Sequence, residues 1–223
     1  MPIPLPPCDL VLPCRDEAPA LRDLLPRVPQ PFRVIVVDNG STDDTAATAR
    51  ALGAQVVHES VPGYGAAVHA GVEAATAEFV AIMDGDGSFD PADLLPLLDD
   101  VAAGRADMAV GRRRPVARGV WPWHARLGNA LVVAWLRRRM DFPARDIAPM
   151  RVSGRRALLD LGIQDRRFGY PVELMQRATA AGWRVREHDV AYHPRAEGTR
   201  SKVSGSVRGT ARTARDFWKV LAA

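Results

Sequence analysis

Short apolar runs alternate with helix-like segments along the first half of the chain. The clearest runs, residues 32–37 and 79–83, are continuous and short. Such runs are typical of strands that are covered on both faces of a parallel sheet. The intervening segments carry helix signals, such as Ser41 or Thr42 as a cap and Gly53 as a stop. The alternation predicts an α/β fold: a doubly wound, mainly parallel sheet with helices on both faces.

The expected elements follow one another without a clear linker, so we expect a single domain over residues 1–223. The predicted strands are residues 9–13, 32–37, 54–58, 79–83, 108–110, 150–152 and 185–192. The predicted helices are residues 18–25, 42–52, 65–75, 91–103, 125–140, 155–161, 171–181 and a basic tail helix at 203–223.

Two carboxylates directly follow the run 79–83, in the sequence Asp84-Gly85-Asp86. Aspartate is rarely buried unless it is paired or bound to a metal. Two carboxylates at the end of a central strand can hold Mg²⁺, whose other positions are then filled by water and substrate phosphates. Asp-Gly is also the commonest signal for a hairpin turn, so for this triplet alone a plain turn remains an alternative.

The neighbouring strand ends strengthen the binding interpretation. In a doubly wound sheet, ligands bind beyond the carboxyl ends of the strands. The loops that follow Pro13, Val37 and Met83 should therefore share one edge of the sheet, and each contains acidic residues. Three acidic loops on one edge predict a site rather than three unrelated turns.

Charge is divided unevenly between the two halves, although the whole chain has a net charge of only +4. Residues 1–110 carry 6 Lys/Arg and 17 Asp/Glu, whereas residues 111–223 carry 24 and 9. An acidic half can hold a cation, and a basic half can hold phosphates, a nucleic acid or an anionic membrane surface. The asymmetry therefore predicts two tasks within one domain.

The sequence favours a cytoplasmic protein. No apolar run approaches the roughly 18 residues that a membrane span needs. The proline-rich start, residues 1–7, has no basic residue and does not read as a signal peptide. Cys8 and Cys14 flank a predicted strand, and we expect both to be reduced thiols.

Six segments in order resemble family 2 glycosyltransferases of type-A fold, particularly the dolichyl-phosphate-mannose-synthase-like branch. These segments are Leu12-Pro13-x-x-Asp16-Glu17, Val36-Val37-Asp38-Asn39-Gly40-Ser41-Thr42-Asp43-x-Thr45, Gly63-Tyr64-Gly65-Ala66-Ala67, Met83-Asp84-Gly85-Asp86, Gly111-x-Arg113 and Arg195-x-x-Gly198-Thr199-Arg200-Ser201-Lys202. Two positions depart from the family pattern. Arg15 stands where many members have an aromatic residue, and Ser88 stands where members of the lipid-phosphate branch often have glutamine.

The resemblance implies a nucleotide-diphosphate sugar donor of UDP or GDP type, and inversion at the anomeric carbon. Residues 1–110 would then be the nucleotide-sugar-binding half and 111–223 the acceptor-side half. The resemblance implies that Pro13, Arg15 and Glu17 line the nucleoside pocket and that Asp38 contacts the base or ribose. It implies that Asp84 and Asp86 hold Mg²⁺ or Mn²⁺ on the diphosphate, and that Gly65 and Gly85 lie in the binding loops. It also implies that the phosphates are bound by Arg113, Arg195 and Lys202. Metal and cations would stabilise the charge of the leaving diphosphate.

Two acceptor classes stay open. A polyprenyl phosphate is already ionised, whereas a soluble hydroxyl needs a general base. The resemblance points to Asp146 and Glu173 as candidate bases; alternatively, Asp146 pairs with Arg145 or Arg151, and Glu173 is an exposed helix carboxylate. The basic tail helix would allow peripheral contact with anionic lipid. We expect Trp121 and Trp123 to pack rather than to bind.

Two other functional classes fit less well. A sugar-1-phosphate nucleotidylyltransferase would need a glycine-rich loop after its first strand, but residues 13–17 contain no glycine. A nucleic-acid-binding module could use the basic half, but no recognised signature is present. The acidic edge would also repel a phosphate backbone. We therefore expect no nucleic-acid partner.

Overall fold

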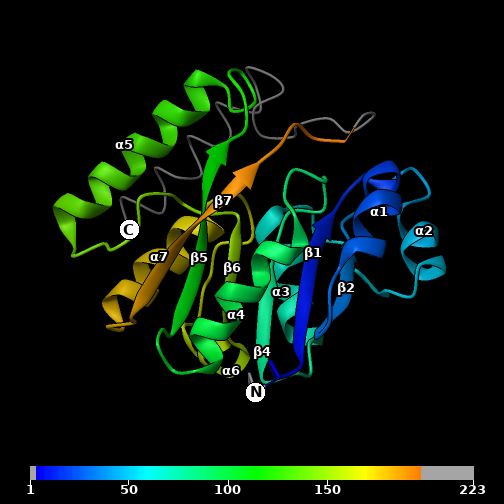
Figure 1. Ribbon diagram of the computed structural model, residues 1–223, viewed down its shortest axis with the longest axis horizontal. Helices are drawn as coiled ribbons and strands as arrows, with labels where there is room; N and C mark the ends of the chain where they lie inside the picture. Colours follow the sequence, from blue (N-terminus) through cyan, green and yellow to red (C-terminus); the bar gives the residue numbers. More distant parts are fainter. Residues whose placement is uncertain (1–3, 197–223) are drawn as a thin grey trace.

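A single seven-stranded sheet organises the structure, a computed structural model that describes residues 4–196 (Figure 1). The strand order is β3-β2-β1-β4-β6-β5-β7. The strands are β1 (Cys8–Cys14), β2 (Phe32–Asp38), β3 (Gln55–His58), β4 (Phe79–Ile82), β5 (Met108–Pro115), β6 (Met150–Gly154) and β7 (Val185–Tyr192). All neighbours pair in parallel except β6, which is antiparallel to both β4 and β5. The expectation of a mainly parallel sheet is confirmed.

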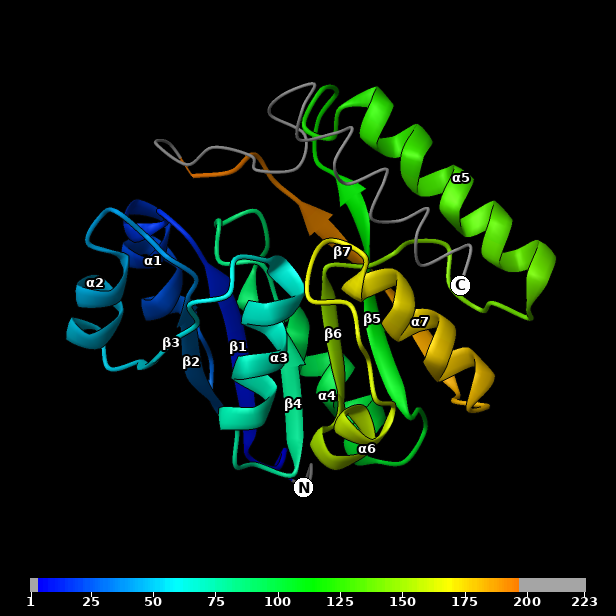
Figure 2. The same cartoon turned by 180° about the vertical axis from the view of Figure 1, so that it is seen from behind.

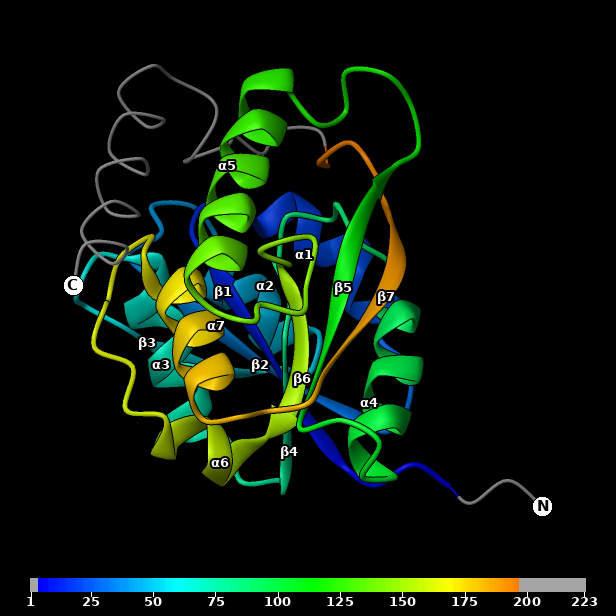
Figure 3. The ribbon, with the colours of Figure 1, turned by 90° about the vertical axis from the view of Figure 1, so that its left-hand side faces the viewer.

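Helices cover both faces of the sheet. One face carries α1 (Ala18–Leu24), the short η1 (Leu25–Arg27), α2 (Thr45–Ala51), η2 (Pro91–Asp93) and α4 (Leu94–Ala102). The other carries α3 (Tyr64–Ala74), α6 (Arg155–Asp160) and α7 (Tyr170–Ala180), which lie in front of the sheet in Figure 2. The long helix α5 (Trp123–Arg139) extends in Figure 3 from the top of the molecule down past the upper ends of β5 and β7.

Alternation along the strands divides the core into two layers. Val11, Ile82 and Val110 face α3 and α7, whereas Leu10 and Ala81 face α1 and α4. All five are at most 2 % exposed. Because both faces are covered, these strands have no polar face, and their sequences read as continuous apolar runs.

The reversed direction of β6 brings the segment before it to the functional edge. Ile82 pairs with Arg151, and Gly111 pairs with Met150. A strand that runs against its neighbours begins where they end, so the residues just before Met150 enter the sheet at the carboxyl ends of β4 and β5.

Strand β5 is longer than the sequence predicted. We expected residues 108–110, but the strand continues to Pro115 because residues 112–115 pair with β7. Consecutive side chains of a strand point to opposite faces, so Arg112 and Arg114 lie on the same face. Both pair with acidic side chains of β7. Main-chain pairing and ion pairs, rather than an apolar face, hold this extension.

Most other boundaries agree with the sequence prediction to within about two residues. The predicted tail helix lies outside the described residues. Within residues 4–196, no helix has both the length and the apolar character that a membrane span requires.

Candidate active site

The loops after β1 and β2 are joined to each other at the carboxyl edge of the sheet. The Asp16 amide donates to Ser41 Oγ at 3.0 Å, and Asp16 Oδ1 accepts from the Thr42 amide at 2.7 Å. The Ala18 amide donates to Asp43 Oδ2 at 3.1 Å. Burial alone would raise the pKa of Asp43, but hydrogen bonds from Thr45 and Ala18 lower it. These acidic side chains therefore build the rim of the site.

The four residues expected at the nucleoside pocket lie on this same rim. Pro13 pairs with Val37 near the ends of β1 and β2, and Arg15 is exposed beyond them. Glu17 is buried. Asp38 Oδ1 accepts from the Ser41 amide at 3.0 Å, and Asp38 Oδ2 lies 3.2 Å from His58 Nδ1. The structure thus places them together, and their contacts to a nucleoside stay a prediction.

Gly85 allows the loop after β4 to pack closely on the loop after β1. A Cβ at Gly85 would lie 2.4 Å from Cys14 Sγ and 3.1 Å from Glu17 Oε2. Only glycine fits this approach without a shift of neighbours. Gly85 therefore fixes the position of the two aspartates beside it.

Asp84 and Asp86 form the acidic centre of this edge. Asp86 is buried, and its Oδ1 accepts from the Ser88 amide at 3.0 Å and the Ser88 hydroxyl at 2.5 Å. Burial and the charge of Asp86 raise the pKa of Asp84 to about 6, against the opposing effect of Arg195, Arg113 and Arg151. Two carboxylates that disfavour each other's charge are well suited to share a divalent cation.

The donor set fits Mg²⁺ or Mn²⁺ bound to a diphosphate. Within residues 4–196, no group of three or more His, Cys, Asp or Glu side chains gathers as a metal cage. Mg²⁺ commonly uses one or two carboxylates and takes its remaining oxygens from water and phosphates. Asp84 and Asp86 would hold such an ion, while the substrate supplies the rest.

Arg195 already contacts this acidic pair. Its Nη1 lies 3.1 Å from Asp86 Oδ2. The chain after β7 runs along the loop after β4, because the His193 amide donates to the Ser88 carbonyl and the Ala196 amide to the Asp86 carbonyl, at 2.9 and 3.0 Å. The structure therefore places Arg195 beside Asp86, and its contact with a phosphate stays a prediction. Lys202 lies outside the described residues.

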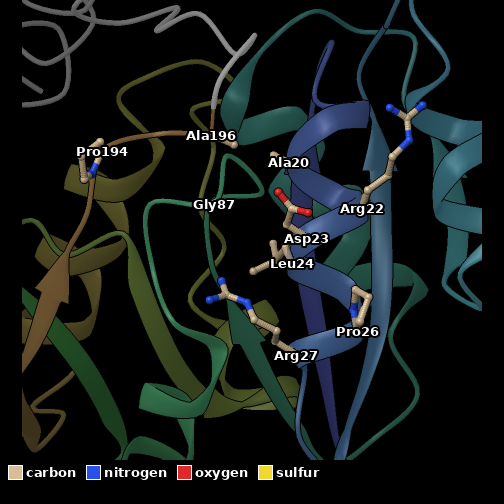
Figure 4. A pocket seen from close by; sticks show the side chains of 9 residues that line it. All are labelled: Ala20, Arg22, Asp23, Leu24, Pro26, Arg27, Gly87, Pro194 and Ala196. Carbon is tan, nitrogen blue, oxygen red and sulfur yellow. The ribbon is translucent and has the colours of Figure 1, made fainter.

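A pocket of about 570 Å³ lies beside this junction (Figure 4). Gly87, Pro194 and Ala196 line one side, and residues of α1 and η1, among them Arg22 and Arg27, line the other. Its lining includes none of the residues that the sequence analysis assigned to the site. The pocket is adjacent to the carboxylates without containing them.

Arg113 and Asp146 are paired rather than separate. Arg113 Nε donates to Asp146 Oδ2 at 2.9 Å and Nη2 to Oδ1 at 2.6 Å, and the Arg113 amide adds a third bond at 3.0 Å. The Arg113 guanidinium also lies 4.0 Å from the centre of the Trp121 ring. The partner of Asp146 is thus Arg113, not Arg145 or Arg151, and Trp121 packs as expected.

Arg151 is a buried cation that the sequence analysis did not place in the site. It is 2 % exposed, and its Nη2 donates to the Ile147 carbonyl at 2.9 Å. Its Nε and Nη1 have no hydrogen-bond partner in the described part of the chain. Its charge acts on Tyr64 and on Asp84. Nothing in the segment Met150-Arg151-Val152 indicated this burial, which depends on the insertion of β6 between β4 and β5.

Glu173 has structural partners at the start of α7. Its carboxylate accepts from the amides of Gln164 and Asp165 at 3.0 and 2.7 Å, and from Arg177 Nε at 2.6 Å. Burial would raise the pKa of Glu173, but these hydrogen bonds lower it. A carboxylate held in this way is a weak base, and its catalytic role stays a prediction.

Gly65 also packs against the segment that Glu173 holds. The Gly65 amide donates to the Arg167 carbonyl at 3.0 Å. A Cβ at Gly65 would lie 2.7 Å from Tyr170 Cβ and 2.8 Å from the Arg166 carbonyl carbon. Close packing accounts for this glycine, and its contact with a ligand stays a prediction.

Comparison with known proteins places the chain in a family. Residues 9–159 match the model of Glycosyl transferase family 2. The chain is 57 % identical over 213 residues to an uncharacterized glycosyltransferase of Mycobacterium tuberculosis, covering 95 % of this chain and 96 % of the relative. It is 32 % identical over 217 residues to polyprenol monophosphomannose synthase of Mycolicibacterium smegmatis, covering 88 % of this chain and 81 % of that enzyme.

Solved structures share the fold. Glucosyl-3-phosphoglycerate synthase from Mycobacterium tuberculosis, crystallised with Mg²⁺ and uridine-diphosphate, matches with a TM-score of 0.77 at 19 % identity. The match covers 97 % of this chain and 78 % of that one. Mannosyl-3-phosphoglycerate synthase from Rubrobacter xylanophilus matches with a TM-score of 0.75 at 18 % identity, covering 97 % and 73 %. The family match and the identity of the relatives together establish that this chain is a member of glycosyltransferase family 2.

Proposed function

We propose that the protein is an inverting glycosyltransferase that moves a sugar from a nucleotide-diphosphate sugar to a polyprenyl phosphate, in the cytoplasm at the membrane face. The donor class is supported by the edge that carries Asp84 and Asp86, and by fold neighbours crystallised with uridine-diphosphate and Mg²⁺ or with uridine-diphosphate-glucose and Mn²⁺. The acceptor class is supported by the similarity to polyprenol monophosphomannose synthase.

One observation carries the acceptor proposal: the carboxylates of both candidate bases already accept hydrogen bonds from other residues of the chain. Asp146 gives both oxygens to Arg113, and Glu173 accepts from two amides and from Arg177. A hydroxyl acceptor must lose a proton to a positioned base. A phosphate monoester is already ionised and needs none. An acceptor phosphate therefore fits the described site better than a hydroxyl.

The cations around the acidic pair suit a transfer between two phosphates. Arg113, Arg151 and Arg195 all act electrostatically on Asp84. In the proposed reaction, an acceptor phosphate oxygen forms a bond to the anomeric carbon while the bond from that carbon to the diphosphate breaks. The electron pair leaves with the diphosphate.

Charge therefore accumulates on the diphosphate as the bond breaks. Mg²⁺ or Mn²⁺, when held by Asp84 and Asp86, would neutralise part of it. Arg195 lies next to Asp86 and would contact the same diphosphate. Arginine suits this role because its guanidinium can bind two phosphate oxygens at once.

Transfer of label tests the proposal. Radiolabelled UDP- and GDP-sugars are offered with Mn²⁺, first with polyprenyl phosphate in vesicles and then with soluble sugars or alcohols. We expect label to enter the lipid, and Glu173→Gln to retain most of the activity. Label that enters only a soluble acceptor, and is lost in a folded Glu173→Gln variant, would instead support a hydroxyl acceptor with a catalytic base.

A further inference from the structure

The outward side of α5 is apolar. Trp123, Leu127 and Leu131 are 75 %, 51 % and 62 % exposed, although large apolar side chains usually avoid solvent. Their spacing of four residues places them on one face of the helix. The opposite face is also apolar, since Val133 and Leu136 are buried in the core. Within residues 4–196, the outer stripe therefore does not pack against the domain.

The part of the sequence that carries this stripe is rich in arginine and contains no acidic residue. Residues 111–140 contain eight arginines and no aspartate or glutamate. On α5 itself Arg126, Arg137, Arg138 and Arg139 are all exposed. A helix with Trp and Leu on one face and arginines beside them is typical of helices that lie in a membrane interface.

The inner side of α5 reaches the candidate active site. Asn129 Oδ1 accepts from the Ile147 amide at 3.0 Å and lies 3.4 Å from Arg113 Nη2. One helix thus contacts the Arg113–Asp146 pair on its inner side and presents the apolar stripe outward. A surface bound to that stripe would be separated from the Arg113–Asp146 pair only by α5, the helix drawn in Figure 3.

We propose that this outer face of α5 docks the enzyme on an anionic lipid bilayer. The apolar stripe enters the interface, and the flanking arginines bind lipid phosphates. The inference deepens the proposed function, because it brings the site to the membrane in which a polyprenyl phosphate resides. It does not require the tail beyond residue 196.

The charge pattern argues against the two main alternative occupants. In a symmetric dimer through this face, the arginines of one copy would lie near those of the other, and like charges repel. A nucleic acid would satisfy the arginines but would leave Trp123, Leu127 and Leu131 against a polar backbone. An anionic bilayer complements both parts of the surface.

Vesicle flotation of the full chain, without nucleotide or acceptor, tests the docking. The vesicles contain either phosphatidylcholine alone or phosphatidylcholine with phosphatidylglycerol. The test variant is Leu127→Gln/Leu131→Gln. The matched control is Leu52→Gln/Val61→Gln, which removes two similarly exposed apolar side chains away from α5. Thermal unfolding checks that both variants fold.

We expect the wild type and the control to float with the anionic vesicles at low salt. The ratio of bound to free protein should fall about tenfold in the test variant, because each leucine loses its apolar burial. Arg137→Gln/Arg138→Gln should weaken binding several-fold, as should high salt.

Three results would overturn the docking proposal. These are equal flotation of test and control variants, equal binding to neutral and anionic vesicles, and a concentration-dependent dimer that the leucine substitutions abolish while no flotation occurs. Failure of the acceptor proposal looks different: the protein would float normally but would not label polyprenyl phosphate.

Discussion

Arg113 on β5 holds both carboxylate oxygens of Asp146, which precedes β6, at 2.9 and 2.6 Å. The pair links the extended end of β5 to the segment that enters the sheet between β4 and β5. Asp146 is only 1 % exposed, so its carboxylate contacts Arg113 rather than water. The pair therefore fixes the geometry of the acceptor side of the site.

Asp146→Asn should destabilise the fold substantially. The substitution leaves a largely buried guanidinium without its counter-charge, and breaking a buried pair costs about 3 kcal/mol or more. Urea unfolding measures the loss. Asp189→Asn is the matched control, because Asp189 pairs with Arg114 on the same strand pair but is exposed, and such pairs contribute about 1 kcal/mol or less. Equal losses in the two variants would contradict a structural role for the Arg113–Asp146 pair.

Metal binding should depend on the ionisation of Asp84. Its pKa, raised from 3.8 to about 6, means that the metal-free folded protein keeps a proton that the unfolded chain releases. This contribution to stability is complete below about pH 4 and is lost as the pH rises through 6. Mn²⁺ with UDP or GDP binds the ionised form, so the thermal shift that they cause should grow between pH 5 and pH 7.5.

Asp84→Asn is the control for this pH dependence. Without a ligand at pH 7.5 this variant should be more stable than the wild type, because it removes the repulsion from Asp86. It should also lose the metal-dependent thermal shift. An equal shift at pH 5 and pH 7.5 in the wild type would contradict the role of Asp84.

Arg151 should act by keeping Asp84 ionised. Arg151→Met removes a buried charge whose field lowers the pKa of Asp84, and the pH midpoint of Mn²⁺-dependent nucleotide binding should move upward. The fold should survive, since a well-packed apolar side chain often replaces a buried ion without loss. Arg156→Met, at an exposed position on α6, is the control. An unchanged midpoint in Arg151→Met would show that Arg151 does not influence the acidic pair.

Gly85→Ala should disturb Asp84 and Asp86 through overpacking of the loop between them. The added methyl group would lie 2.4 Å from Cys14 Sγ, and overpacking of this kind costs about 1–3 kcal/mol. Cys14→Ala should restore much of the loss in the double variant, which a double-mutant cycle measures. Gly128→Ala on α5 meets nothing within 4 Å and should be neutral or stabilising. No rescue by Cys14→Ala would place the strain elsewhere.

The sheet and the acidic edge were predictable because they depend on local pattern. The strands buried on both faces read as apolar runs, and a strand that ends in Asp84-Gly85-Asp86 carries its signal in eight consecutive residues. The parallel direction of β1, β2, β3 and β4 follows from the helix-length connections between them. These features need no knowledge of distant contacts.

The features that escaped prediction all depend on pairing between distant segments. The extension of β5 exists because residues 112–115 meet β7, and the partner of Asp146 lies 33 residues away. Trp123 was expected to pack, but it is exposed because α5 turns other side chains inward. The environment of Arg151 likewise depends on the antiparallel insertion of β6.

Calorimetric titration of UDP and GDP, with and without Mn²⁺, tests the central claim that Asp84 and Asp86 hold a metal-bound nucleotide diphosphate. The wild type and Asp86→Asn are compared with Asp90→Asn, whose carboxylate accepts from the Ala92 amide. We expect Mn²⁺-dependent binding of one nucleotide by the wild type and by Asp90→Asn, and its loss in a folded Asp86→Asn. Wild-type affinity in Asp86→Asn in the presence of Mn²⁺ would contradict the claim.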